Sequence, residues 1–218
     1  MSEAPNTQEP KEPSGARLAL TLAFAGLISG VALVFTYELT KPVIARNREA
    51  ALRAAVGRVV PGAKSMRKLV WRDGALQPAS AADKDAAVLI AFDARGAAVG
   101  FAIVTEGPGF QDTIRLIYGF DASTNTITGM EVLESRETPG LGDKIYKDPD
   151  FVKQFKKLSV QPSVKLVKKG KGSGTANEVD AITGATISSK AVIKIINTAD
   201  KTWRSRLGTV DRNKVRAP

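Results

Sequence analysis

The first hydrophobic pattern in the chain is an apolar run near its N-terminus. No residue from Leu18 to Tyr37 is charged, and a helix of this length just spans the hydrocarbon core of a bilayer. The run therefore predicts a transmembrane helix over residues 18–37. A cleaved signal peptide is the alternative. Its apolar run would be shorter, and no small-x-small cleavage site follows Tyr37, so a retained anchor is favoured.

The segments around this run differ in character. Residues 1–17 are polar and contain three prolines, which predicts a disordered tail on the cytoplasmic side. Residues 38–62 predict a juxtamembrane helix and linker, with Pro42 at the start of the helix and Pro61-Gly62 ending it. A folded domain is expected over 63–210, followed by a C-terminal tail over 211–218.

Within 63–210, alternating and β-rich runs are separated by turns, which predicts an antiparallel sheet. The predicted strands are Lys68–Trp71, Ala87–Phe92, Ala98–Val104, Ile114–Phe120 and Thr126–Leu133. The expected fold class is therefore α+β: one N-terminal transmembrane helix, followed by a domain whose antiparallel sheet is flanked by helices.

Three further segments complete this prediction. Asp148–Leu158 has its apolar residues on one side and predicts a short helix. Apolar residues recur at helical spacing from Ser189 to Leu207, which predicts a second helix with Ser188 as its N-cap. The lysine- and glycine-rich run Lys165–Gly174 predicts a solvated loop, with a docking patch as the alternative.

The amino-acid composition excludes several kinds of cofactor and catalytic site. The chain contains neither cysteine nor histidine, so it has no disulfide, no cysteine-ligated iron–sulfur cluster and no c-type haem attachment. It also lacks the commonest zinc ligand and the usual general base of hydrolases. We therefore expect no metal site and no catalytic residue set. Any redox chemistry requires an organic cofactor, and a flavin is the natural candidate.

The net charge of +10 suggests an anionic partner. Nucleic acid is disfavoured, because the chain has a membrane segment and no nucleic-acid motif. A surface that faces anionic lipid or an acidic protein of the same complex is favoured. Two basic residues precede the apolar run, whereas Lys41, Arg46, Arg48 and Arg53 follow it. The positive-inside rule then places the domain in the cytoplasm, although the rule is weakest for long translocated domains.

A hydroxyl-rich turn precedes the C-terminal helix. The N-terminus of a helix presents free N–H groups and the positive end of its dipole, which suits a phosphate. The sequence Asp-x-x-Thr-Gly-Ala-Thr in this turn resembles the acceptor motif of flavin transferases, which attach FMN through its phosphate to the last threonine. The resemblance implies that Thr186 is the acceptor. The recognition positions are then Asp180, Thr183, Gly184 and Ala185.

A second motif, Glu-Thr-Pro-Gly-Leu-Gly-Asp-Lys-Ile, occupies residues 137–145. By itself it is typical of a tight turn leaving a strand. With the acceptor motif downstream and a single anchor upstream, it resembles the G subunit of the Rnf electron-transport complex, and it is similar to the C subunit of the sodium-pumping NADH:quinone reductase. The resemblance implies that the loop lies against the flavin, with Lys144 nearby. The positions at the isoalloxazine are then Glu137, Thr138, Leu141 and Gly142.

The resemblance also implies a function. The chain would be an electron-carrying component of a membrane complex that couples electron transfer to ion translocation, and not a complete enzyme alone. Its partners would be the other subunits and, during maturation, a flavin transferase. The domain would lie on the periplasmic side of the inner membrane. The alternatives are the C subunit of the quinone reductase, and a stand-alone membrane-anchored flavoprotein acting as a sensor or binding module.

Overall fold

A computed structural model describes residues 14–80, 83, 88–208 and 210. The chain divides into two units, Met1–Glu49 and Ala50–Pro218. The tails predicted over 1–17 and 211–218 lie outside the described residues, except for residues 14–17, where the first helix begins.

Helix α1 runs without interruption from Gly15 to Val59. It contains the one helix segment in the described part of the chain that is long and apolar enough to cross a membrane, and none of that segment is buried. The prediction of a separate helix starting at Pro42 is wrong, because Pro42 lies inside α1. A proline inside a helix removes a single i→i−4 hydrogen bond, here the one to the carbonyl oxygen of Glu38, and the helix continues on both sides of it.

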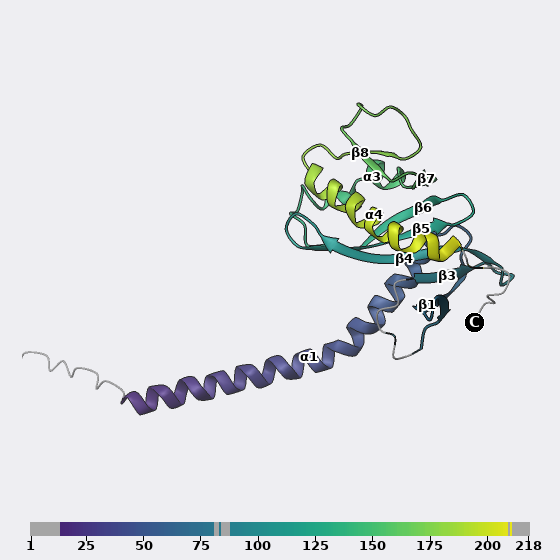
Figure 1. Ribbon diagram of the computed structural model, residues 1–218. Helices are drawn as coiled ribbons and strands as arrows, with labels where there is room; N and C mark the ends of the chain where they lie inside the picture. Colours follow the sequence, from purple (N-terminus) through teal and green to yellow (C-terminus); the bar gives the residue numbers. More distant parts are fainter. Residues whose placement is uncertain (1–13, 81–82, 84–87, 209, 211–218) are drawn as a thin grey trace, which may run out of the picture. The chain divides into compact units, whose positions relative to one another are not determined.

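The domain is built on one seven-stranded antiparallel sheet in the order β2-β1-β3-β4-β5-β6-β7 (Figure 1). Its strands are β1 Ser65–Arg72, β2 Ala75–Pro78, β3 Val88–Phe92, β4 Ala98–Pro108, β5 Thr113–Asp121, β6 Thr126–Glu134 and β7 Leu158–Ser159. The predicted antiparallel sheet is confirmed. Its short edge strands β2 and β7 were not predicted, because four and two residues carry too little alternation to be recognised.

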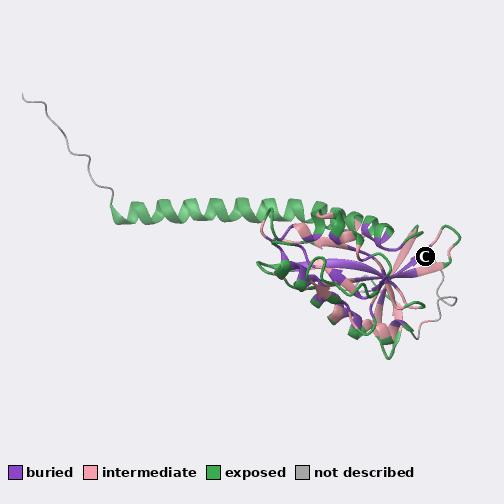
Figure 2. Ribbon diagram, turned by 90° about the horizontal axis from the view of Figure 1, so that it is seen from above, coloured by how far each residue is buried: buried purple, intermediate pink, exposed green. Residues whose placement is uncertain are grey.

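Both faces of the sheet are covered, which explains why its central strands are buried along most of their length (Figure 2). Successive side chains of a strand point to opposite faces. On β4, Phe101 and Ile103 therefore join the core beneath helix α4 (Thr186–Gly208), whereas Ala102 packs against the last turns of α1. The sheet thus separates two hydrophobic cores.

The C-terminal end of α1 approaches the sheet at two glycines. A Cβ on Gly119 would overlap the carbonyl oxygen of Val59, and one on Gly129 would lie 3.1 Å from Val59 Cα. Thr128 Oγ1 donates to that same oxygen at 2.5 Å. Glycine at both positions therefore allows the backbone of the helix to contact the backbone of the sheet.

The remaining elements are short. Helices α2 (Lys144–Lys147) and α3 (Pro149–Lys153) follow β6, and a parallel pair is formed by β8 (Lys165–Val167) and β9 (Glu178–Asp180). The predicted helix Asp148–Leu158 is too long, because α3 ends at Lys153, turns follow over residues 154–157, and Leu158 begins β7. The predicted loop Lys165–Gly174 is likewise corrected, since its first three residues form β8.

Candidate functional site

The predicted acceptor segment connects β9 to α4. Gly184 has a φ of +84°, and Ala185 N donates to the carbonyl oxygen of Ile182 at 3.0 Å, which forms a tight turn. Helix α4 begins at Thr186, since Ser189 N already donates to the carbonyl oxygen of Ala185. The prediction of Ser188 as N-cap is therefore wrong. It is Ser189 Oγ that fastens the turn, accepting from Ile182 N at 3.2 Å.

The turn presents its hydroxyls outward. Thr183, Gly184 and Thr186 are exposed, whereas Ala185 is buried beneath them. Thr186 Oγ1 makes one long contact within the described part of the chain, 3.5 Å to the carbonyl oxygen of Ile182. A cleft of about 420 Å³ opens beside it, lined by Leu166, Val167, Lys168, Lys169, Ala181, Thr183, Gly184 and Thr186. The Thr186 hydroxyl is therefore accessible at the N-terminus of a long helix.

The position of Asp180 is fixed by a hydrogen bond from its backbone N–H group. The Asp180 N–H donates to Gln154 Oε1 at 2.7 Å, which connects the acceptor segment to the region after α3. Asp180 and Thr183 also line a second, larger cleft of about 640 Å³, whose other side is formed by α2 and α3 and includes Lys144. The acceptor segment thus separates two clefts, each of a size typical for small-ligand sites.

Glu137, predicted to lie at the flavin ring, has its carboxylate inside the protein, with 5% of the residue exposed. Its Oε1 accepts from the N–H groups of Phe110 and Gln111 at 2.8 and 3.0 Å. Its Oε2 accepts from Ser188 Oγ, on the first turn of α4. One carboxylate therefore joins the β4–β5 turn, the loop after β6 and the N-terminus of α4.

Two glycines make room for this carboxylate. A Cβ on Gly142 would lie 2.7 Å from Glu137 Oε2, and one on Gly109 would overlap Oε1. Burial opposes ionisation of Glu137, but hydrogen bonds from Ser188 Oγ and from the backbone N–H groups of Gln111 and Phe110 outweigh it. The pKa of the Glu137 carboxyl is consequently lowered.

The two sequence motifs, about fifty residues apart, meet in the fold. Besides the contact between Glu137 and Ser188, the Leu141 side chain lies against the acceptor turn, 3.8 Å from where a Cβ on Gly184 would stand. Thr138 Oγ1 donates to Gln111 Oε1 at 3.0 Å and is half-buried. The structure therefore brings together most of the predicted site residues, and Lys144 lies on the wall of the adjoining larger cleft.

Apart from Leu141, sequence reasoning missed the exposed apolar side chains around this site. In the described part of the domain, four large hydrophobic residues are exposed: Phe110, Leu141, Tyr146 and Ile187. Phe110 belongs to the turn that binds Glu137, and Ile187 follows Thr186 on α4. Ile187 could have been noticed as an apolar residue outside the buried stripe of its helix, whereas the exposure of Phe110 depends on the turn that carries it.

These features fit FMN. A phosphate ester requires an accessible hydroxyl near N–H donors, which Thr186 and the first turn of α4 provide. An isoalloxazine is flat and largely apolar, and exposed Leu141 and Ile187 lie beside that turn. The residues present are therefore suited to hold the cofactor.

Comparison with known proteins shows two family models and several relatives that match this chain. The family model described as the FMN-binding domain matches residues 109–201, and the one described as the RnfG N-terminal region matches residues 11–59. The crystal structure of Shewanella oneidensis NqrC aligns with a TM-score of 0.62 at 23% identity, over 76% of this chain and all of that one, and shows the same fold. The C subunit of the Na(+)-translocating NADH-quinone reductase from Parabacteroides distasonis aligns with a TM-score of 0.56 at 27% identity, over 68% of this chain and 79% of that one.

Curated relatives cover most of the chain. The G subunit of the ion-translocating oxidoreductase complex of Vibrio vulnificus is 32% identical over 81% of this chain and 83% of its own length. The G subunit of the Na(+)-translocating ferredoxin:NAD(+) oxidoreductase complex of Acetobacterium woodii is 30% identical over 87% of this chain and 91% of its own. With the anchor helix, the sheet and an FMN-binding domain all in place, the chain belongs to the family of the G subunits of ion-translocating oxidoreductase complexes.

Proposed function

We propose that this chain is the electron-carrying component of a membrane-bound complex that couples electron transfer to ion translocation, and that it holds FMN as a phosphoester on Thr186. The observation that carries the proposal is the exposed Thr186 hydroxyl at the N-terminus of α4, in a cleft beside the loop of residues 137–142. When bound, FMN supplies the one- or two-electron chemistry, and the protein sets its position and exposure.

The chain's own residues suit the phosphate end of the cofactor. The first N–H groups of α4 have no acceptors within the helix, and the helix dipole is positive there. Lys168 and Lys169 line the same cleft and add positive charge. Gly184 leaves the approach to Thr186 free of a side chain. These groups favour a phosphate anion at the turn.

The ring end of the cofactor would meet the loop of residues 137–142. Leu141 and the neighbouring Ile187 expose apolar surface for the ring, and Thr138 offers a hydroxyl at its edge. The Glu137 carboxylate points into the protein, where it accepts hydrogen bonds from Ser188, Phe110 and Gln111. We therefore assign Glu137 the role of positioning the loop rather than that of contacting the ring.

The C subunit of the quinone reductase is the second candidate, favoured by the shared fold. The Vibrio anguillarum protein of that name is 34% identical to this chain, but over 41% of this chain and 37% of its own length. The relatives from ion-translocating oxidoreductase complexes cover twice as much of the chain. An Rnf-type protein is expected to be encoded beside five companion subunits, whereas a stand-alone sensor would lack them.

The test of the proposal is covalent loading of the full chain. Co-expressed with a flavin transferase that acts outside the cytoplasm and purified from membranes, the protein should fluoresce in a denaturing gel and gain the mass of one FMN less water. Reversible bleaching and recovery of the flavin absorbance under reductant and oxidant should follow. The proposal would be contradicted if the full chain, exported in cells that also contain the active transferase, showed no flavin fluorescence in the denaturing gel.

The side of the membrane is a separate prediction. Because flavin transferases of the kind implied by the acceptor motif act outside the cytoplasm, we expect the domain there, in spite of the basic residues that follow the apolar run. An alkaline phosphatase fused after Pro218 should be active in whole cells. Activity from a cytoplasmic reporter at the same position, with an inactive phosphatase fusion, would place the domain in the cytoplasm instead.

A further inference from the structure

The positive charge of this chain is concentrated beside the proposed flavin site. Residues 144–171 contain nine lysines and two aspartates, so this segment carries +7 of the chain's net +10. All nine basic residues are lysines rather than arginines, and eight of the nine are exposed. Such a concentration of like charges is unfavourable for folding unless a partner of opposite charge offsets it.

Three of these lysines share one tight turn after β8. Lys171 N donates to the carbonyl oxygen of Lys168 at 2.8 Å, and Gly170 has a φ of +70°. The chain beyond the turn is fixed by Glu178, whose carboxylate accepts from Ser173 N at 2.7 Å and Ser173 Oγ at 2.6 Å. The lysines are therefore presented from an ordered loop, and Glu178, the nearest carboxylate along the chain, is already engaged.

The neighbouring acidic residues neutralise other lysines. Asp143 pairs with Lys147 at 2.7 Å, and Asp150 pairs with Lys153 at 2.6 Å. Within the described part of the chain, Lys144, Lys168 and Lys171 have no such partner. We call the surface formed by Lys144, Lys168, Lys169 and Lys171 the lysine surface.

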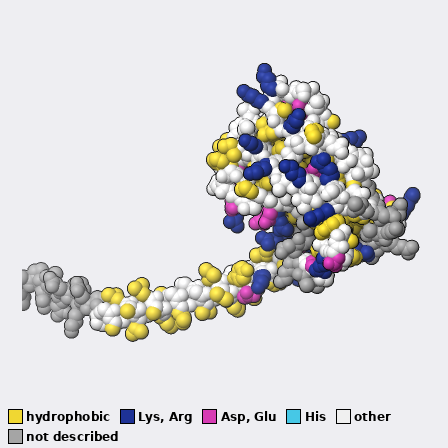
Figure 3. Space-filling view, in the orientation of Figure 1, with side chains coloured by type: hydrophobic (Ala, Val, Ile, Leu, Met, Phe, Trp, Pro, Cys, Tyr) yellow, Lys and Arg dark blue, Asp and Glu magenta, His cyan; other side chains and the backbone are white. Residues whose placement is uncertain are grey.

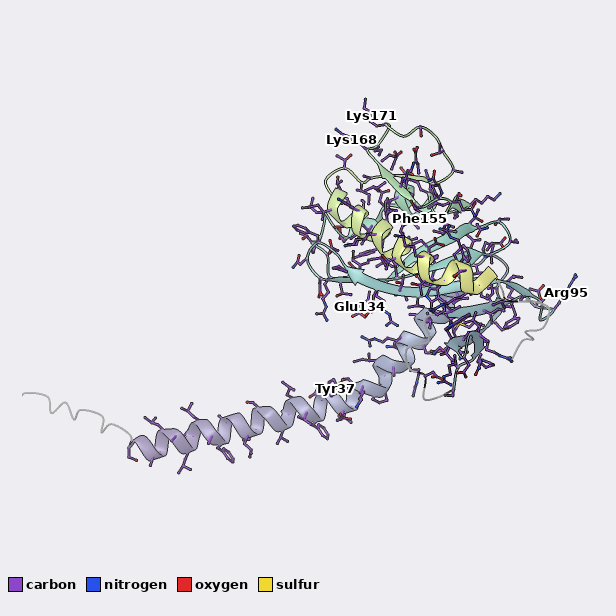
Figure 4. All side chains as sticks on the ribbon, in the orientation of Figure 1. Tyr37, Arg95, Glu134, Phe155, Lys168 and Lys171 are labelled. Atoms are coloured by element: carbon purple, nitrogen blue, oxygen red, sulfur yellow. The ribbon has the colours of Figure 1, made fainter. Side chains whose placement is uncertain are left out.

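The lysine surface borders both clefts at the acceptor turn. Lys168 and Lys169 line the cleft that contains Thr186, and Lys144 and Lys169 line the larger one. Figure 3 shows dark blue side chains over the part of the domain above the sheet. Figure 4 places Lys168 and Lys171 at the end of the domain near the start of α4, and Arg95 at the opposite end.

We propose that the lysine surface docks the acidic face of a redox protein that exchanges electrons with the flavin. The inference rests on the proposed function. A phosphodiester on Thr186 carries one negative charge, so the cofactor leaves most of these lysines unneutralised. Exposed lysines that surround a redox site raise the rate of encounter with an acidic partner, and they suit the small, transient interfaces of electron transfer.

A lipid surface is the less favoured occupant. A bilayer lying on these lysines would also cover the cleft at Thr186, because Lys168 and Lys169 form part of that cleft. It would then block the approach of any partner to the flavin. An acidic protein on the same surface brings its own redox centre toward the cofactor.

The experiment measures docking without flavin. The full chain with Thr186→Val is placed in nanodiscs of zwitterionic phosphatidylcholine, and binding of the soluble domain of cytochrome b5, an acidic redox protein, is measured by biolayer interferometry at low and at physiological salt. We expect binding that weakens as salt rises. Lys168→Glu with Lys171→Glu should weaken it by about tenfold or more, and Lys168→Gln with Lys171→Gln by less.

The matched control is Lys64→Glu with Arg95→Glu, which changes the net charge equally and should leave binding within about twofold. Arg95 lies at the opposite end of the domain, and Lys64 N donates to the carbonyl oxygen of Phe92, just before the turn that carries Arg95. Basic cytochrome c should not bind. Equal losses in both double variants, or cytochrome b5 binding unaffected by either, would overturn the proposal. The proposal would also be overturned if the variant with Lys168→Glu and Lys171→Glu lost binding to phosphatidylglycerol vesicles but still bound cytochrome b5 as the wild type does.

The outcome is separable from that of the proposed function. If the wild-type chain never acquires flavin but binds cytochrome b5 through Lys168 and Lys171, the flavin assignment fails and the docking surface stands. If the wild type carries flavin, the stopped-flow rate of cytochrome b5 reduction by the reduced, loaded protein provides a second readout. This reduction rate should fall in the variant with Lys168→Glu and Lys171→Glu, in parallel with its loss of binding.

Discussion

Replacing Thr186 by valine is expected to abolish covalent flavin attachment while the protein remains folded. The ester needs a hydroxyl oxygen, and valine keeps the branched shape of threonine without one. The lost contact is weak, since Thr186 Oγ1 lies 3.5 Å from the carbonyl oxygen of Ile182. An exposed side chain at the start of a helix typically contributes about 1 kcal/mol or less. In-gel fluorescence and intact mass measure attachment, and circular dichroism checks the fold.

Two matched variants separate acceptor from recognition. Thr186→Ser retains a hydroxyl at the same place and should still be labelled to some degree. Thr183→Val removes the other exposed hydroxyl of the turn, three residues earlier, and should slow labelling without removing the acceptor. A Thr186→Val protein that still carried covalent flavin would refute the assignment, and flavin lost from Thr183→Val but retained in Thr186→Val would move the acceptor to Thr183.

Replacing Glu137 by alanine is expected to cost about 2–4 kcal/mol of unfolding free energy, because it leaves the part-buried N–H groups of Phe110 and Gln111 and the buried Ser188 hydroxyl without their acceptor. Urea unfolding of the full chain in detergent, followed by the fluorescence of Trp71 and Trp203, measures the loss. Both tryptophans are half-buried in the domain, where they flank Arg206.

Glu137→Gln is the conservative control. An amide oxygen can accept from the two backbone N–H groups, and the Ser188 hydroxyl can turn to accept from the amide nitrogen. We expect it to retain most of the stability. Ser188→Ala removes one of the three donors and should cost less than Glu137→Ala. Equal stability of Glu137→Ala and wild type would show that the carboxylate does not hold these segments together.

Comparing the wild type with Glu137→Gln also tests how the stability contributed by Glu137 depends on pH. The pKa of Glu137 is lower in the folded protein than its ordinary value of 4.5, which the unfolded chain restores. Ionised Glu137 therefore adds stability above pH 4.5, and this contribution is lost as pH falls through the folded pKa. The wild type should lose more stability than Glu137→Gln below pH 4.5, and parallel pH profiles would exclude Glu137 as the titrating group.

Several features of this protein are determined by short stretches of sequence. The uncharged run of residues 18–37 specifies an apolar helix because every one of its backbone groups can be satisfied within the helix itself. The alternating and β-rich runs predict five of the seven sheet strands, since both patterns are typical of strands when turn residues separate them. The identification of Thr186 as candidate acceptor is likewise local, because it rests on the resemblance of residues 180–186 to the acceptor motif of flavin transferases.

Longer-range contacts decided what these stretches could not. Pro42 was expected to begin a helix, yet the helical path of α1 continues through it. Ser188 was expected to cap α4, yet the helix starts earlier and its hydroxyl donates to Glu137. At Ser188, a capping preference worth about 1 kcal/mol gave way to a hydrogen bond with a residue 51 positions away. At Pro42, the residues near the proline did not reveal that the helix starts well before it.

Glu137 shows the same limit at the site itself. Local motifs identified the loop of residues 137–142 and the acceptor turn, and the resemblance placed Glu137 at the flavin ring. The inward direction of its carboxylate emerges only in the folded domain, because its donors Phe110, Gln111 and Ser188 come from segments 27, 26 and 51 residues away. A hydrogen bond across such separations depends on how the sheet and α4 pack, and no local pattern encodes it.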